Sequence, residues 1–240
     1  MYSCAIVLSS SLSLYARFEM NFLKNDRYMV LLYGLQNTLL VALYAALLGT
    51  VLGIILALVR LPESRGGFMR PIAVICDAYV DVIRGTPMVV QLMIWAYVII
   101  TNPGIPKIAV ASIAFGANSA AYVSEIMRAG IQSIDRGQTE AGRSLGLSQI
   151  ATMRLIILPQ AIKNILPALV NEFIVLIKET SIMGYVGLLD LAKAGDNIRG
   201  RTFDAFMPLI AVAIIYYVIV KILTLALGRL ERRLRASDHH

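Results

Sequence analysis

Five long runs of apolar residues alternate with short polar segments along the chain. The runs lie at residues 30–59, 71–100, 108–127, 155–177 and 206–227. Because a helix rises 1.5 Å per residue, about 20 apolar residues are enough to cross the hydrocarbon core of a bilayer. The runs reach that length, so the pattern predicts an all-α membrane protein with five transmembrane helices.

The second run carries a break. Residues 84–87 read Arg-Gly-Thr-Pro in the middle of it, and proline removes a backbone donor and kinks a helix. Before the break, Asp77, Asp81 and Arg84 are spaced i, i+4 and i+7, so they share one helix face. We expect a buried ion pair among them and a kink directly after it.

Composition supports a membrane protein and excludes several other classes. Hydrophobic residues make up 58% of the 240 residues and charged residues 15%, whereas soluble chains carry roughly 25% charge. The two histidines are the last two residues, which excludes histidine-based catalysis and a His-rich metal site within the fold. The chain also lacks a glycine-rich phosphate loop ending in Lys-Ser or Lys-Thr. We therefore expect no catalytic residue, no bound metal and no ATP site of its own.

The basic residues predict how the chain is oriented. The net charge is +7, and the Lys and Arg residues form short clusters between apolar runs, so no nucleic-acid partner is expected. With the N-terminus outside, the cytoplasmic segments carry eleven Lys and Arg and the outside segments carry seven. Cytoplasmic loops are typically the more basic ones. We therefore expect the N-terminus outside and the C-terminus in the cytoplasm, with the reverse orientation as the alternative and with membrane lipid in contact with the basic segments.

These features divide the chain into three parts. Residues 1–27 form an N-terminal extension and lead-in, of which residues 1–19 carry no span and are expected to be dispensable. Residues 28–235 form the five-helix membrane domain, whose cytoplasmic loop covers residues 128–154. Residues 236–240 are a tail. The segment between the fourth and fifth runs is expected to be a mixed, polar connection.

The cytoplasmic loop is longer than a turn requires and is expected to be functional. Residues 138–145 can form a short helix that Gly146 ends, since glycine is the usual helix terminator. Ser148 can cap a second helix that leads into the fourth apolar run. Two such helices would project beyond the bilayer, where they would either dock a partner or lie on the surface as amphipathic helices.

This loop resembles a known family. The segment Glu-Ala-Gly at residues 140–142 resembles the EAA loop of ATP-binding-cassette (ABC) importer permeases, and Gly146 and the Ile-Leu-Pro segment at 157–159 extend the resemblance. In that family the loop makes a coupling helix that docks in a groove of the ATPase subunit. The coupling residues that the resemblance implies are Gln138, Glu140, Ala141, Gly142, Ser144 and Gly146. Gly142 departs from the family pattern, in which a second alanine is usual.

Further stretches resemble the permease subunits of polar amino acid importers. They lie at residues 82–87, 118–125, 171–173 and 178–181. The resemblance covers about residues 31–235 and implies the type I ABC importer permease fold. It also implies the function of a membrane-spanning subunit in an ATP-driven importer, which translocates amino acids across the cytoplasmic (inner) membrane by alternating access.

The same resemblance implies an assembly. The chain would pair with a second permease subunit, identical or paralogous, with two ATP-binding cassette subunits, and with an extracytoplasmic amino-acid-binding protein. ATP and Mg would be bound by the ATPase subunits. The chain itself would hold no cofactor and would not be an enzyme.

Polar residues inside the third and fourth runs are candidates for the transport path, because a charge within a span usually faces protein or water. Asn118, Tyr122 and Glu125 are spaced i, i+4 and i+7 and share one face of the third run. The fourth run also carries a polar face, and the two faces are expected to meet. The predicted substrate-binding residues are Asn118, Ser119, Tyr122, Glu125 and Glu172. The alternatives are hydrogen bonds between spans and, for Glu125, an ion pair with Arg128.

Two other functions are compatible with the sequence. An autonomous ion-coupled transporter or channel subunit would also need intramembrane ionisable groups, but it would not need a helical projection at the cytoplasmic face. A structural assembly subunit would need neither. Co-purification with a stoichiometric ATPase would separate the importer from both alternatives.

Overall fold

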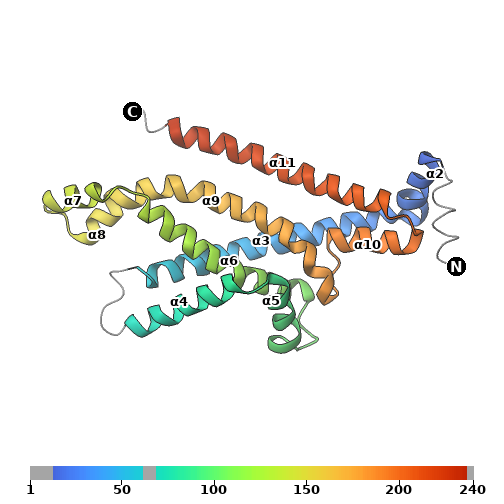
Figure 1. Ribbon diagram of the computed structural model, residues 1–240, viewed down its shortest axis with the longest axis horizontal. Coiled ribbons are helices and arrows are strands. Elements are labelled where there is room, and N and C mark those ends of the chain that lie inside the picture. Colours follow the sequence, from blue (N-terminus) through green and yellow to red (C-terminus); the bar gives the residue numbers. More distant parts are fainter. Residues whose placement is uncertain (1–12, 62–68, 237–240) are drawn as a thin grey trace.

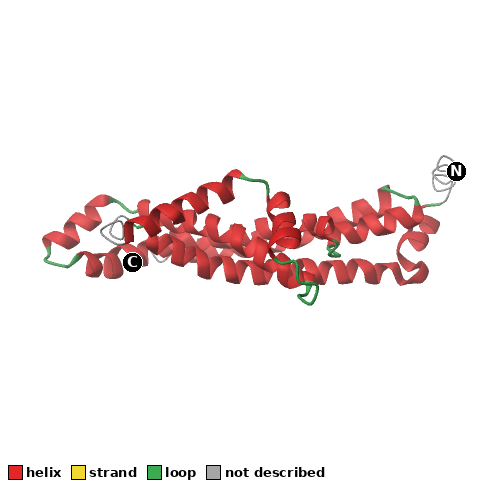
Figure 2. Ribbon diagram, turned by 90° about the horizontal axis from the view of Figure 1, so that it is seen from below, coloured by secondary structure: helices red, strands yellow, loops and turns green. Residues whose placement is uncertain are grey.

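The computed structural model describes residues 13–61 and 69–236. Within these ranges all regular structure is helical and no strand occurs, as predicted for an all-α protein. The helices lie roughly along one direction and form an elongated bundle (Figures 1 and 2). Residues 1–12 and most of the predicted tail fall outside the described residues.

The two ends of the bundle carry different elements (Figure 1). One end, called the α7 end below, holds α7 (Arg136–Ser144) and α8 (Gln149–Thr152). The opposite end, called the α10 end, holds α2 (Leu14–Phe18) and α10 (Leu191–Thr202). The last helix, α11 (Phe206–Ala236), begins at the α10 end and runs back toward the α7 end.

Two helical segments are long and apolar enough to cross a membrane by length and composition. They are Leu14–Val59, which contains α3 (Arg27–Val59), and Phe206–Arg229 within α11. The bent pair Met69–Gly85 and Met88–Ile99 brings the number to three if it forms one span. These segments overlap the first, second and fifth apolar runs of the sequence.

The third and fourth apolar runs also form helices. They are α6 (Lys107–Gln132) and α9 (Leu158–Glu179), which contain 26 and 22 residues. Polar side chains interrupt their apolar surface, and in α6 the polar residues Asn118, Ser119 and Ser124 are buried. Protein rather than lipid therefore encloses the polar positions of α6.

The predicted break in the second run is confirmed. The helix α4 (Met69–Gly85) ends there, and α5 (Met88–Ile94) continues into the π-helical turn η4 (Trp95–Ile99). The two halves are bent by 113° relative to each other. Pro87 lies at the bend and cannot donate the backbone hydrogen bond that would continue α4.

Small residues allow α3 to pack closely against α6. They recur every four positions along α3 and are all buried: Ala45, Gly49, Gly53 and Ala57. At Gly53 an added Cβ would lie 2.5 Å from the Cβ of Val123 in α6. Small residues at this spacing let two membrane helices approach, so α6 and its polar residues are held in the interior of the bundle.

The connection between α9 and α11 contains a helix that the sequence did not predict. The 3-10 turn η6 (Thr180–Val186) precedes α10, whose charged residues leave no long apolar run. Asp190 caps α10, since its Oδ1 accepts a hydrogen bond from the backbone N–H of Lys193 at 2.9 Å and its Oδ2 accepts one from Gly184 at 2.8 Å. A helix held by its cap and by tertiary packing does not need the apolar run of a span.

Residues 13–19 make contacts within the fold. These contacts count against the expectation that residues 1–19 are dispensable, which stays a prediction. The Arg17 guanidinium pairs with the Asp204 carboxylate, with Nη2 2.7 Å from Oδ1 and Nε 3.0 Å from Oδ2. The Asn21 amide donates to the same carboxylate at 2.9 Å. A segment too short to span a bilayer can still close the end of a bundle, and this one ties the N-terminal region to the junction of α10 and α11.

The loop at residues 128–154 folds into the two predicted helices. Gly146 follows α7 with φ of +83°, the left-handed conformation that glycine adopts without a steric penalty. The Ser148 hydroxyl oxygen accepts a hydrogen bond from the Ala151 N–H at 3.2 Å and caps α8. From α8 the chain continues through the π-helical turn η5 (Met153–Ile157) directly into α9.

Candidate functional site

The first candidate site is the surface of α7 at one end of the bundle. Asp135 begins the helix, because its carboxylate accepts a hydrogen bond from the Gly137 N–H at 2.7 Å. The predicted coupling residues other than Gly142 are exposed on this helix or directly after it: Gln138, Glu140, Ala141, Ser144 and Gly146. The structure therefore brings these predicted residues together on one accessible projection.

Gly142 has a packing role that the sequence pattern did not show. It is buried, and an added Cβ would lie 2.8 Å from Thr152 Cγ2 and 2.9 Å from Ile156 Cδ1. Contacts this short require a neighbour to shift. Glycine at this position lets α7 lie directly against α8 and η5, so the projection is joined firmly to the start of α9.

Two large apolar side chains at the tip of the projection escaped the sequence interpretation. Leu145 is 81% exposed and Ile150 is 80% exposed. Both flank the turn at Gly146, beyond the polar residues of α7. Exposed apolar residues on a rigid projection are typical of a protein-docking surface. Their signal in the sequence was an apolar residue on either side of a predicted turn.

The second candidate site lies where the broken helix meets α6. The Gln91 amide nitrogen donates to the carbonyl of Ile83 at 2.7 Å and to the hydroxyl of Thr86 at 2.8 Å. Its oxygen accepts a hydrogen bond from the amide of Asn118 at 3.0 Å. Gln91 is thus joined to both sides of the break and to α6, and it is only 6% exposed.

Gln91 was not among the predicted site residues, although it is a polar residue within an apolar run. Its role depends on a partner 27 residues away, which spacing on one helix cannot reveal. The predicted residue Asn118 is buried, and its amide is engaged with Gln91. The structure therefore assigns Asn118 a contact between helices.

The polar faces of α6 and α9 do meet, as predicted. The Ser119 hydroxyl donates a hydrogen bond to Glu172 at 3.0 Å. Nearer the α7 end, the Asn164 amide donates to the Ser133 hydroxyl at 2.8 Å. Within residues 13–61 and 69–236, Ser119 is the hydrogen-bond partner that the structure gives to the Glu172 carboxylate.

Glu125 lies in a separate cluster of charged residues. Its Oε1 is 2.7 Å from Nη1 of Arg60, and its Oε2 is 2.6 Å from Nη2 of Arg128. Arg84 approaches Oε2 at 3.5 Å. The expected alternative, an ion pair between Glu125 and Arg128, is therefore present. Arg60, which the sequence interpretation did not select, is the residue that joins α3 to this cluster.

The expectation of a buried ion pair among Asp77, Asp81 and Arg84 is wrong. Asp77 pairs with Arg60, whose Nε lies 2.7 Å from Oδ1, and Arg84 approaches Glu125. Asp81 and Arg84 are exposed in this chain rather than buried. The spacing i, i+4 and i+7 placed the three on one face, but two of them are paired with residues of neighbouring helices.

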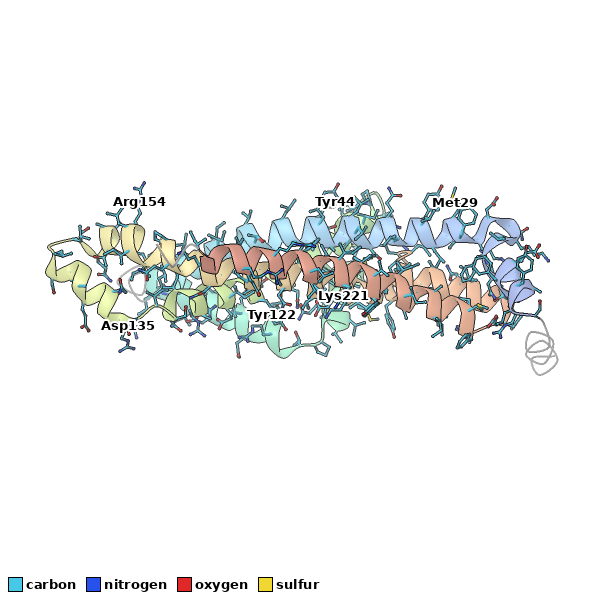
Figure 3. The ribbon with its side chains drawn as sticks, turned by 90° about the horizontal axis from the view of Figure 1, so that it is seen from above. Met29, Tyr44, Tyr122, Asp135, Arg154 and Lys221 are labelled. Atoms are coloured by element: carbon cyan, nitrogen blue, oxygen red, sulfur yellow. The ribbon has the colours of Figure 1, made fainter. Side chains whose placement is uncertain are left out.

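Tyr122 belongs to the same cluster through its ring. The Arg84 guanidinium carbon lies 5.7 Å from the centroid of the Tyr122 ring, which is within the range of a cation–π contact. Tyr122 lies near the middle of the elongated molecule (Figure 3). The predicted substrate residues thus fall into three groups: Asn118 with Gln91, Ser119 with Glu172, and Tyr122 and Glu125 with the arginines.

The part of the chain that the structure describes contains no cluster of three or more His, Cys, Asp or Glu side chains suited to a metal ion. The chemistry available in the three groups is that of amides, hydroxyls, carboxylates and guanidinium groups. These can bind and orient a polar or charged ligand. They provide no activated nucleophile.

Comparison with known proteins identifies the family. Residues 49–236 match the family described as "Binding-protein-dependent transport system inner membrane component". The arginine transport system permease protein ArtQ of Bacillus subtilis (strain 168) is 42% identical over 216 residues, which cover 87% of this chain and 94% of the relative. The glutamine transport system permease protein GlnP of Escherichia coli (strain K12) is 35% identical over 210 residues, with 86% and 93% covered.

Solved structures share the fold. A crystal structure of an amino acid ABC transporter with histidines matches with a TM-score of 0.80 at 41% identity, covering 88% of this chain and 98% of that one. The MetNI methionine ABC transporter in an inward-facing conformation matches with a TM-score of 0.70 at 21% identity, covering 86% and 97%. The fold is therefore that of the type I ABC permeases. The chain belongs to the family of inner membrane components of binding-protein-dependent transport systems.

Proposed function

We propose that the chain is the membrane-spanning subunit of an ATP-driven importer that carries amino acids across the inner membrane by alternating access. The observation that carries this proposal is the rigid α7 projection with its exposed Leu145 and Ile150. An autonomous transporter or channel has no need of such a surface. The relatives named for arginine and glutamine transport support amino acids as the cargo.

The proposed topology has five spans, with the α10 end outside and the α7 end in the cytoplasm. α6 and α9 complete the set: Asn118, Ser119 and Ser124 of α6 are buried, and Ser119 meets Glu172 of α9. The domain limits stay at residues 28–235 for the membrane domain and 128–154 for the coupling loop. The basic loop segments and the basic end of α11 then lie on the cytoplasmic side.

The proposed assembly contains a second permease subunit, identical or paralogous, and two ATP-binding subunits that hold ATP and Mg. An extracytoplasmic amino-acid-binding protein would dock at the α10 end, and membrane lipid surrounds the spans. The chain itself would carry out no hydrolysis and would hold no cofactor. Two solved ABC transporters with this fold support such an arrangement.

In this assembly α7 acts as the coupling helix. Its exposed residues Gln138, Glu140, Ala141 and Ser144 would contact the ATPase groove, while Leu145 and Ile150 would fill an apolar pocket in it. Gly142 holds α7 against α8 and η5, and Gly146 provides the turn between the helices. Because η5 leads directly into α9, movement of the projection would be transmitted to a span.

The proposed substrate contacts are made by Asn118, Ser119, Tyr122, Glu125 and Glu172, and the groups differ in role. Glu172 has a single hydroxyl partner among the described residues, so its carboxylate retains capacity to bind an ammonium or a cationic side chain. Tyr122 and Glu125 would hold Arg84, whose side chain is 45% exposed and whose guanidinium could pair with a substrate carboxylate. Asn118 would act through Gln91 on the break.

Co-purification tests the proposal. The tagged chain, expressed with its candidate ATPase, should retain that ATPase in stoichiometric amount. A Leu145→Asp variant places a charge in the proposed apolar contact and should release the ATPase. Tyr185→Asp introduces the same negative charge at an exposed aromatic residue elsewhere in the chain, and this variant should retain the ATPase. Equal ATPase retention by both variants would count against α7 as the docking surface.

A further inference from the structure

A cavity at the α7 end lies between the charged cluster around Glu125 and the coupling helix. Its volume is about 790 Å³, and it lies between the ends of α3 and α6, α7 and η5. Three arginines line it, Arg60, Arg128 and Arg136, and no lining residue carries a carboxylate. The remaining wall is largely apolar and includes Leu61 and Ile134. The cavity therefore combines a cationic rim with an apolar surface.

The arginines reach the cavity from three different elements and are positioned in two ways. Asp77 and Glu125 hold the Arg60 guanidinium, with distances of 2.7 Å to each. Arg128 is held at 2.6 Å by the other oxygen of Glu125. Arg136 has no ion pair with any residue in the ranges 13–61 and 69–236. Guanidinium groups held apart in this way leave donors for a ligand with several anionic oxygens, and phosphate fits that geometry.

The depth of the cavity relative to the bilayer decides which phosphate compound fits. Arg60 directly follows the candidate span Leu14–Val59, so the proposed topology places its guanidinium near the cytoplasmic end of that span. A soluble phosphate would gain nothing from the apolar wall of Leu61 and Ile134, whereas the glycerol and upper acyl chain of a lipid would bury against it. Basic pockets at the cytoplasmic ends of spans are suited to lipid headgroups.

We propose that this cavity binds the phosphate headgroup of an anionic phospholipid, with part of one acyl chain against its apolar wall. The lipid would bridge the end of α3 through Arg60, the end of α6 through Arg128 and the coupling helix through Arg136. Bound lipid would thereby restrict the position of α7 relative to the spans. This site does not depend on which substrate the transporter carries.

The test uses the complete transporter, permease with ATPase, in nanodiscs of phosphatidylcholine with or without phosphatidylglycerol. Native mass spectrometry counts the phosphatidylglycerol that stays bound. Arg136→Gln removes a charge from the cavity, and Thr139→Glu adds a carboxylate to its wall. Loss of one charge-assisted contact should weaken retention about tenfold or more. The matched control is Arg154→Gln, because Arg154 is exposed and does not line the cavity.

In Figure 3 the labelled Arg154 projects from one side of the α7 end and Asp135, the neighbour of Arg136, lies on the other.

Both cavity variants should lose bound phosphatidylglycerol, while the Arg154→Gln control keeps the wild-type amount. Equal retention in all proteins, or equal loss in the control, would overturn the proposal. Displacement of the lipid by inorganic phosphate at equal concentration would assign the cavity to a soluble anion and would overturn it as well.

Discussion

The Ser119 hydroxyl donates a 3.0 Å hydrogen bond to the Glu172 carboxylate, and this contact joins α6 to α9 inside the bundle. A carboxylate within a span is costly unless it meets water, a cation or hydrogen-bond donors. One hydroxyl leaves most of the acceptor capacity of Glu172 unused. The contact therefore marks a position where a cationic group of a substrate can be received.

Glu172→Gln should separate substrates by charge. The substitution keeps size and hydrogen bonding but removes the charge, and a charge-assisted hydrogen bond in a protein interior is worth about 1.5–3 kcal/mol, or roughly 10- to 150-fold in affinity. We expect the KM for basic amino acids to rise by that factor and the KM for acidic ones to rise less. Uptake into vesicles across a panel of basic, acidic and amide amino acids measures it.

Glu125→Gln provides the comparison for Glu172→Gln. Glu125 is in contact with Arg60, Arg84 and Arg128, so its loss should affect all substrates alike by disturbing Arg84. A charge-selective effect of Glu125→Gln, together with a uniform effect of Glu172→Gln, would reverse the two assignments.

Gln91→Leu should disturb the broken helix. It would leave the Ile83 carbonyl and the Asn118 amide without their partner, and each unpaired buried polar group costs about 1–3 kcal/mol. We expect a lower Tm of the purified transporter and slower transport. Gln132→Leu is the control, because Gln132 is exposed near the end of α6. The role given to Gln91 would fail if both variants had the same Tm.

Gly146→Val should weaken coupling without preventing insertion. At φ of +83° a side chain with a Cβ is strained by about 1–2 kcal/mol, and a β-branched residue is among the least tolerated there. We expect reduced stimulation of ATP turnover by substrate. Gly146→Asn, which tolerates the left-handed conformation better, should restore most of it. Normal stimulation in Gly146→Val would exclude a role for this turn in coupling.

The Arg17–Asp204 pair predicts a dependence of stability on pH at the α10 end. The hydrogen bond from Arg17 lowers the pKa of the Asp204 carboxyl below its ordinary value, although burial opposes the change, and Asn21 adds to the lowering. A carboxylate with a depressed folded-state pKa stabilises the fold at pH values above its unfolded pKa of about 3.9. That contribution is lost as the pH falls through the folded-state pKa.

The Tm of the wild type should therefore fall on acidification below about pH 4, and Arg17→Gln should lower the Tm at neutral pH and flatten this dependence. Lys24→Gln removes one positive charge from the same region and is the control. Thermal unfolding of the purified transporter across a pH series gives the measurement. Identical pH profiles for Arg17→Gln and the wild type would show that the pair does not tie the N-terminal segment to the bundle.

Local features of the sequence were sufficient to predict several parts of this fold. The apolar runs of α3 and α11 are long enough to be recognised by length alone. Pro87 marks the bend, and Gly146 and Ser148 mark the turn and the cap after α7. In each case the physical cause lies within a few residues of the feature, so a single sequence contains the information.

The missed features depend on contacts between distant residues. α10 is polar, and its start is fixed by Asp190 and by its fit against α3, where a Cβ at Gly34 would lie 2.6 Å from the Asp190 carbonyl oxygen. Gln91 likewise pairs with Asn118, 27 residues away, and Arg60 donates to the hydroxyl of Ser124, 64 residues away. Helical periodicity places residues on a face, but it does not show which other helix that face meets.

ATP-dependent uptake tests the central claim most directly. The permease should be reconstituted in vesicles with its ATPase and binding protein, and uptake of labelled amino acids should be followed with and without ATP on the side of the α7 end. We predict uptake only when ATP, the ATPase and the binding protein are all present, and its loss in Leu145→Asp. Uptake driven by an ion gradient in vesicles that contain the permease alone would contradict the account.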